Sequence, residues 1–119
     1  MLKLGLINYL NAFPFSWPIT RDQNPAKSWQ FVLARPGKLN QLLAQGELQM
    51  SLVSAFEYLR NQQDYLIAPG ISLSSKGYVN SVKLVSKVPI GELDGKTIHT
   101  TSASATSISI LSILLGERN

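Results

Sequence analysis

The apolar residues of this chain come in short runs separated by turn residues, and most of these runs predict β-strands. Several are almost continuously apolar, whereas residues 78–86 alternate apolar and polar positions with a period of two. The predicted strands are residues 2–7, 29–34, 48–53, 65–68, 78–86 and 97–100.

A helix is predicted between the second and third strands. Leu39, Leu42 and Leu43 lie on one face at helical spacing. Pro36 fits the first turn, and Gly46 is expected to end the helix in a left-handed cap. Because strands alternate with short helices, the predicted fold class is α/β with a mostly parallel sheet.

Three further segments have a predicted structure. Ser54 followed by Glu57 is the pattern of a capping box at the start of a short helix. Residues 13–18 hold two prolines and are expected to stop regular structure. Residues 108–115 are apolar nearly all round, typical of a buried helix, although the alternation at residues 107–110 also allows a strand.

Composition excludes several kinds of chemistry. The chain has 119 residues, enough for one domain or a piece of a larger protein, and 45% of them are hydrophobic against 15% charged, which suits a globular core. The absence of cysteine excludes disulfides, thiolate catalysis and cysteine metal sites. The single histidine, His99, excludes a multi-histidine metal site.

Charge and hydropathy also limit the partners. The net charge is +4, but the basic residues are scattered, so we expect no nucleic acid partner. No basic segment leads into a long apolar stretch at the N-terminus, and residues 108–115 are too short to span a bilayer. We therefore expect no membrane partner and a cytoplasmic location.

Residues 87–96 form the best candidate boundary, because proline, glycine and aspartate are concentrated there. Beyond this boundary the sequence predicts one strand and one helix, which is too little for a domain. An all-round apolar helix has nothing there to pack against. The chain is therefore expected to be a fragment, or a half that needs another chain.

Three segments carry candidate chemistry, and each lies where a strand ends or a helix begins. We call them the asparagine loop (residues 8–15), the serine loop (71–81) and the hydroxyl segment (101–107). Ligands of open α/β sheets bind beyond the carboxyl ends of strands, and amides can hold a carboxylate or hydroxyl without adding charge. The hydroxyl segment precedes a predicted helix, whose N-terminus favours an anion.

Each segment also has a plainer interpretation. The asparagine loop fits an Asn-capped turn, the serine loop fits an ordinary polar β-turn, and the hydroxyl segment fits a helix cap with surplus surface hydroxyls.

No carboxylate or histidine side chain is available in these segments. None of them holds an aspartate or glutamate, Glu57 is explained as a capping partner, and His99 on a predicted strand fits a structural or surface role. No serine is expected to have an oriented general base beside it, as a nucleophilic serine requires. In an enzyme, the proton acceptor would lie outside these residues or in the substrate.

Six short motifs together resemble the menaquinone (futalosine pathway) biosynthesis enzyme family, the chorismate dehydratases. Their order and spacing agree along nearly the whole chain. The motifs are residues 7–14, 53–58, 70–77, 81–87, 93–96 and 104–107.

The resemblance implies a two-lobed, periplasmic-binding-protein-like type II fold with the ligand in the cleft. It implies a hydro-lyase that converts chorismate to 3-[(1-carboxyvinyl)oxy]benzoate, with no metal and no organic cofactor. Because the matched motifs hold no base, we hypothesise that the enolpyruvyl carboxylate of the substrate takes the proton.

The resemblance also assigns residues. Asn11 would be the main catalytic or orienting amide. The residues implied to bind the substrate are Asn8, Tyr9, a serine of the group Ser74, Ser75 and Ser81, and, at a helix N-terminus, Ser104, Thr106 and Ser107.

This chain is less than half as long as members of that family. The expected division is residues 1–88 for lobe one, 89–96 for the hinge or crossover, and 97–119 for the truncated start of lobe two. Half a cleft leaves an anionic substrate in water, so little activity is expected from the chain alone. The exposed apolar helix is expected to drive self-association, as a homodimer or a domain swap.

Three alternatives remain open. A dihydroxynaphthoate synthase of the same pathway shares the fold, although the motif at residues 8–11 favours the dehydratase. A non-catalytic small-anion-binding protein of the same fold would usually carry an export signal. The third alternative is an inactive, truncated gene product.

Overall fold

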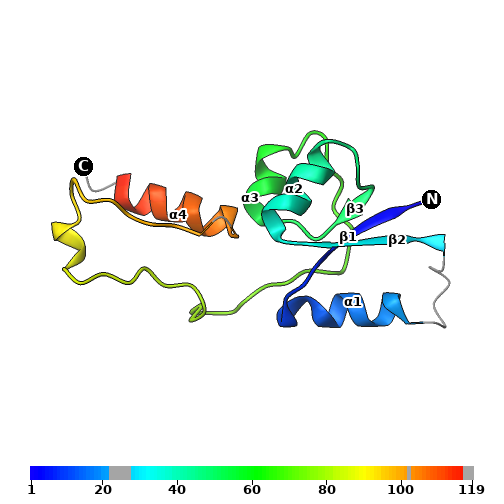
Figure 1. The fold of residues 1–119 in the computed structure, drawn as a ribbon, viewed down its shortest axis with the longest axis horizontal. Helices are drawn as coiled ribbons and strands as arrows, with labels where there is room; N and C mark the ends of the chain where they lie inside the picture. Colours follow the sequence, from blue (N-terminus) through cyan, green and yellow to red (C-terminus); the bar gives the residue numbers. More distant parts are fainter. Residues whose placement is uncertain (22–27, 102, 117–119) are drawn as a thin grey trace.

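The computed structural model of the protein describes residues 1–21, 28–101 and 103–116. Figure 1 shows a sheet with helices at one end of the molecule and α4 at the other. The elements that bear on the site are β1 (Lys3–Ile7), η1 (Leu10–Ala12), α1 (Phe13–Thr20), β2 (Gln30–Ala34), α2 (Pro36–Ala44), β3 (Met50–Ser51), α3 (Ala55–Arg60), η3 (Ile90–Glu92) and α4 (Ala105–Gly116).

The sheet has three parallel strands in the order β2-β1-β3. β1 pairs with β2 along its whole length, from Lys3 opposite Gln30 to Ile7 opposite Ala34. The predicted α/β class with a parallel sheet is therefore confirmed for this part of the chain. The strand predicted at residues 48–53 is much shorter, because only β3 joins the ladder.

The helix α2 forms as its sequence predicts. Pro36 occupies its first turn, and Gly46 has a φ of 72°, the left-handed conformation that glycine adopts without steric cost. The N–H of Gly46 donates to the carbonyl of Leu43 at 2.9 Å, and the N–H of Glu47 donates to that of Leu42 at 2.9 Å. These bonds satisfy carbonyls that the helix end would otherwise leave unpaired.

The core lies where α2 packs on the sheet. Its buried apolar side chains are Leu4, Leu6, Ala12, Leu39 and Leu48.

Gly5 of β1 is enclosed by the side chains of this core. A Cβ at Gly5 would meet the Ser51 hydroxyl and would lie 2.9 Å from methyl carbons of Leu39 and Leu48. Gly5→Ala is therefore expected to lower the free energy of unfolding by about 1–3 kcal/mol, the usual cost of overpacking. Urea denaturation of Gly5→Ala and of Gly91→Ala, whose Cβ would meet nothing within 4 Å, tests this. Equal midpoints for the two variants would contradict it.

The prediction that residues 13–18 stop regular structure is wrong, because α1 runs through them. Pro14 lies in the first turn, where its missing N–H costs nothing, and Pro18 is the only proline in the helix interior. Two features of the helix help to offset the proline. The ring of Phe13 lies 5.1 Å from that of Trp17 one turn on, and the Arg21 guanidinium lies 4.7 Å from the centre of a Trp17 ring.

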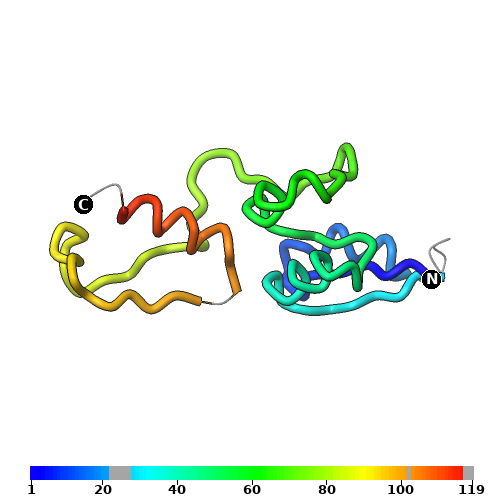
Figure 2. Tube along the Cα trace, turned by 90° about the horizontal axis from the view of Figure 1, so that it is seen from above, coloured from blue at the N-terminus to red at the C-terminus, as the bar shows by residue number. Residues whose placement is uncertain are grey.

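The strands predicted at residues 65–68, 78–86 and 97–100 are also wrong, since none of these segments joins a ladder in the structure. A strand needs a neighbour for its N–H and C=O groups, and the described residues supply none there. Most of their apolar side chains face solvent, with Leu66 100% exposed and Val85 87% exposed, whereas Tyr65 and Ile98 are half-buried. Figure 2 shows this part of the chain as long connections, with η3 in the predicted linker.

The helix predicted at residues 108–115 is confirmed as α4, and the alternative strand is wrong. The prediction that this helix is buried is wrong, because none of its described residues is buried. No helix in the described ranges is long and apolar enough to cross a membrane.

The molecule is elongated and exposes more surface than a compact domain. Its extents are 55 × 28 × 23 Å and its radius of gyration is 17.2 Å, against about 13–14 Å for a compact domain of this length. Its accessible surface is 9531 Å², whereas about 6,400 Å² is typical of a folded monomer of this mass. Many large apolar side chains lie on this surface, among them Leu66, Tyr78 and Val85.

Candidate functional site

The asparagine loop begins at the carboxyl edge of the sheet. Asn8 directly follows β1, and η1 then turns the chain back so that Ala12 is buried while Asn11 stays exposed. In Figure 1 the chain leaves β1 on the side of the sheet that faces α4. Within the described residues, the side chains of Asn8, Tyr9 and Asn11 make no hydrogen bonds and are exposed, so their polar groups are available to a ligand.

The parallel register adds a residue that the sequence reasoning missed. Ile7 pairs with Ala34, so Arg35 leaves β2 at the level where Asn8 leaves β1. Arg35 is exposed, and its carbonyl accepts the first hydrogen bonds of α2, from Lys38 and Leu39. A guanidinium at this edge suits a carboxylate. The signal in the sequence was a basic residue directly after a predicted strand.

Residues 104–107 of the hydroxyl segment lie at the N-terminus of α4, and Ser102 lies outside the described residues. Ser104 precedes the helix, and its Oγ accepts a hydrogen bond from the Ser107 N–H at 3.4 Å and donates to the Ser107 Oγ at 2.7 Å. Ser104 therefore acts as the helix cap, as the plainer interpretation expected. The Oγ1 of Thr106 accepts a hydrogen bond from the backbone N–H of Phe56 at 3.3 Å. This bond brings the hydroxyl segment to the N-terminus of α3.

The serine loop is not brought to the other two segments by any hydrogen bond. Ser74, Ser75 and Ser81 are exposed, lie outside helices and strands, and form no hydrogen bonds within the described ranges. Among the described residues, no hydrogen bond joins any two of the three candidate segments.

The predicted capping box at α3 is half right. The Oγ of Ser54 accepts a hydrogen bond from the Glu57 N–H at 3.2 Å, as expected. The Glu57 carboxylate does not return to the Ser54 backbone. Its Oε1 instead accepts hydrogen bonds from the Asn61 amide at 2.9 Å and the Tyr65 hydroxyl at 3.1 Å. Glu57 therefore ties the end of α3 to the segment after it.

This arrangement raises the pKa of Tyr65 above 10.0, through desolvation first and then through its hydrogen bond to Glu57, which favours the neutral phenol. A raised pKa stabilises the fold fully below the pKa of the unfolded chain, about 10, and this contribution is lost as the pH rises through the folded value. We expect the unfolding midpoint to fall above about pH 10, and to fall less in Tyr65→Phe than in the parent. Denaturation at a series of alkaline pH values tests this, with Tyr78→Phe as the control, because Tyr78 is 95% exposed. An equal fall in the parent and Tyr65→Phe would contradict it.

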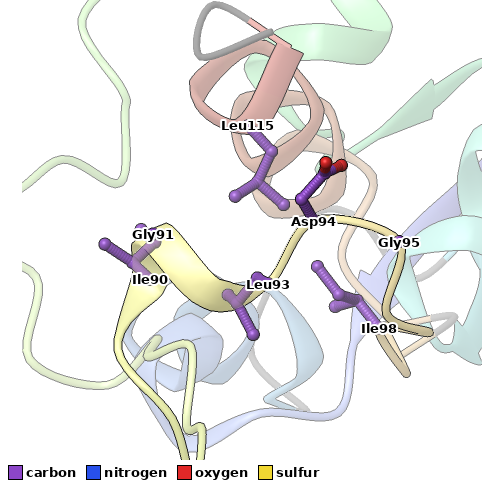
Figure 3. Close-up of a pocket in the computed structure, with 7 residues that line it drawn as sticks. All are labelled: Ile90, Gly91, Leu93, Asp94, Gly95, Ile98 and Leu115. Atoms are coloured by element: carbon purple, nitrogen blue, oxygen red, sulfur yellow. The ribbon is translucent and has the colours of Figure 1, made fainter.

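A pocket of about 450 Å³ lies elsewhere, between η3, the following turn and the end of α4. Figure 3 shows its apolar lining, with Leu115 of α4 facing the carboxylate of Asp94. None of the predicted site residues lines it. Among the lining residues, Asp94 carries the only charge, and its carboxylate would repel an anionic substrate. We therefore do not assign this pocket to the substrate.

No metal centre is formed by the described residues, since no group of three or more histidine, aspartate or glutamate side chains gathers there. His99 is exposed and lies outside the sheet, which fits the surface role expected for it.

Comparison with known sequences decides the family. The sequence profile of the menaquinone biosynthesis family matches residues 2–119. The chain belongs to this family. A chorismate dehydratase from Thermus thermophilus is 34% identical over 114 residues, which is 96% of this chain. This chain spans 40% of the length of the Thermus thermophilus protein. No solved structure matches the chain significantly.

Proposed function

We propose that the chain is the N-terminal portion of a chorismate dehydratase that makes 3-[(1-carboxyvinyl)oxy]benzoate for menaquinone biosynthesis. The observation that carries the proposal is the 34% identity to the Thermus thermophilus chorismate dehydratase along 96% of the chain. The free amides at the carboxyl edge of the parallel sheet support it, because that edge is where α/β sheets bind small molecules.

The proposed architecture is the periplasmic-binding-protein-like type II fold with a cleft between two lobes. Residues 1–88 would form lobe one, residues 89–96 the hinge, and residues 97–119 the start of lobe two. The sheet supports the first assignment, and the short helix η3 inside residues 89–96 is compatible with a hinge. The exposed apolar side chains of residues 65–86 would then be covered by the rest of the fold.

Asn11 would orient the substrate at the reacting carbons, with Asn8 and Tyr9 beside it. Their exposed side chains have no hydrogen-bond partner in the described part of the chain, so binding a ligand would break no existing bond. Arg35 would attract the anionic substrate from the neighbouring strand. Ser104 and Ser107 would hold a substrate carboxylate at the N-terminus of α4, where free N–H groups favour an anion. The proposed contact from Ser74, Ser75 or Ser81 would need the serine loop to approach the asparagine loop.

In the proposed reaction, a ring C–H bond and the neighbouring C–O bond break. The electron pair of the C–H bond becomes the third double bond of the aromatic ring, and the proton and hydroxide leave as water. The proton acceptor would be the enolpyruvyl carboxylate of the substrate, since none of the three candidate segments holds a carboxylate. The chain would contribute orientation and hydrogen bonds, which can supply much of a rate enhancement.

Self-association as a homodimer or domain swap is the proposed behaviour of the chain by itself. The surface in excess of a compact domain is about 3,000 Å², and a stable interface buries about 1,200–2,000 Å² in total. This excess of total surface is larger than the area that a stable dimer interface buries, and it includes exposed apolar side chains.

The proposal is tested by incubating the purified chain with chorismate, following the product by liquid chromatography and the molar mass by light scattering. A monomer is expected to give no product, because half a cleft leaves the ligand in water. Product from a dimer that disappears in Asn11→Ala would support both the function and the assembly. Product from a monomer would overturn the proposed need for a second lobe.

A further inference from the structure

Thr106 adds to the N-terminal cap of α3, which begins at Ala55. The first turn of α3 has backbone N–H groups without partners inside the helix. Ser54 accepts a hydrogen bond from one of them, that of Glu57, at 3.2 Å. Thr106 accepts from another, that of Phe56, at 3.3 Å, and this bond is partly buried.

The bond joins α4 to the part of the molecule that holds the sheet and α3. α3 and α4 pack against each other, and in the described ranges this is the single hydrogen bond between α4 and residues 1–65. It therefore adds a directional contact to the packing of α3 on α4, whose first turn holds Ser107. The Thr106 hydroxyl oxygen is the acceptor in this bond, which does not use its O–H donor.

We propose that Thr106 is a positioning residue that holds the start of the second lobe against the first through the Phe56 N–H. This inference rests on the proposed function only in treating α4 as the start of lobe two. The hydrogen bond and its effect on α3 do not depend on any substrate.

Hydrogen exchange at the Phe56 amide, measured by NMR on the chain without ligand, tests the bond. Thr106→Val keeps the shape of the side chain and removes the acceptor, so exchange at Phe56 is expected to speed up about three- to tenfold, the range for one net hydrogen bond. Thr106→Ser keeps the hydroxyl and should restore protection. Ser109→Ala, which loses a bond made only within α4, is the control and should leave Phe56 unchanged. Equal exchange in the parent and Thr106→Val would overturn the proposal.

A second measurement separates positioning from substrate contact. In the chain combined with the rest of the Thermus dehydratase, Thr106→Val should lower kcat with little change in KM, and Thr106→Ser should restore kcat. A rise in KM with kcat unchanged would mean that Thr106 binds substrate and would overturn the positioning role. If even the parent gives no product, the proposed function fails while the exchange result still decides whether the bond exists.

Discussion

Asn11→Ala is expected to lower kcat for chorismate dehydration by about 100- to 1,000-fold, the usual cost of removing one preorganised hydrogen-bonding group from an active site. The loss should occur without a loss of stability. The Asn11 side chain is exposed and makes no hydrogen bond in the described part of the chain, so truncating it should change the free energy of unfolding by no more than about 0.5 kcal/mol.

The assay requires the chain to be combined with the rest of the Thermus dehydratase, and the matched control is Gln63→Ala. Gln63 is also an exposed amide, but it lies outside the three candidate segments. We expect this variant to keep the parent's activity. Equal activity in Asn11→Ala and Gln63→Ala, with both proteins folded, would remove Asn11 from the site.

Leu39→Ala is expected to lower the free energy of unfolding by about 2–5 kcal/mol, the range for emptying a fully buried leucine site. Leu39 is 0% exposed and lies between α2 and the sheet, where its methyl carbon comes within 2.9 Å of the position of a Cβ on Gly5. Such a loss is a large fraction of the stability of an ordinary domain. The measurement is urea denaturation followed by circular dichroism.

Leu66→Ala is the matched control, because Leu66 is 100% exposed in this structure. In the chain alone it should change stability by less than about 0.5 kcal/mol. In the assembled two-part protein it should cost more, because another polypeptide is expected to cover this segment. An equal loss for Leu39→Ala and Leu66→Ala in the chain alone would contradict the packing of Leu39 between α2 and the sheet.

Local signals in the sequence predicted the first part of the fold well. Pro36 and Gly46 mark the two ends of α2. Proline has no N–H to leave unpaired in the first turn, and glycine adopts the left-handed conformation that follows the last turn. The same holds for Ser54 at α3, where the cap needs only a donor three residues away. These features are decided within one turn of chain, so the sequence alone is enough to predict them.

Interactions over longer distances could not be predicted in this way. The alternation at residues 78–86 has the period of a strand, but a strand forms only if a neighbouring chain supplies the ladder. Glu57 had an expected partner in its own cap and instead bonds Asn61 and Tyr65. The two prolines of α1 argued for a break, whereas in the structure Trp17 contacts Phe13 and Arg21, each one turn away along the helix.

The candidate site shows the same division. The position of Asn8 and Asn11 after a predicted strand was enough to place them at a sheet edge. Arg35 lies at that edge because Ile7 pairs with Ala34. No local sequence pattern predicts this pairing. Thr106 was assigned to the substrate with its neighbours, and its bond to Phe56 depends on how two helices pack.

If this chain supplies the first part of a chorismate dehydratase, it should restore activity to the remaining part of a relative. The chain is mixed with the portion of the Thermus thermophilus chorismate dehydratase that it does not match, and product is followed by liquid chromatography. The Thermus protein divided at the same point is the positive control. We predict 3-[(1-carboxyvinyl)oxy]benzoate from the mixture and none from either part alone. If the divided Thermus protein is active, but this chain binds the complementary Thermus portion and gives no product, the proposed function is contradicted.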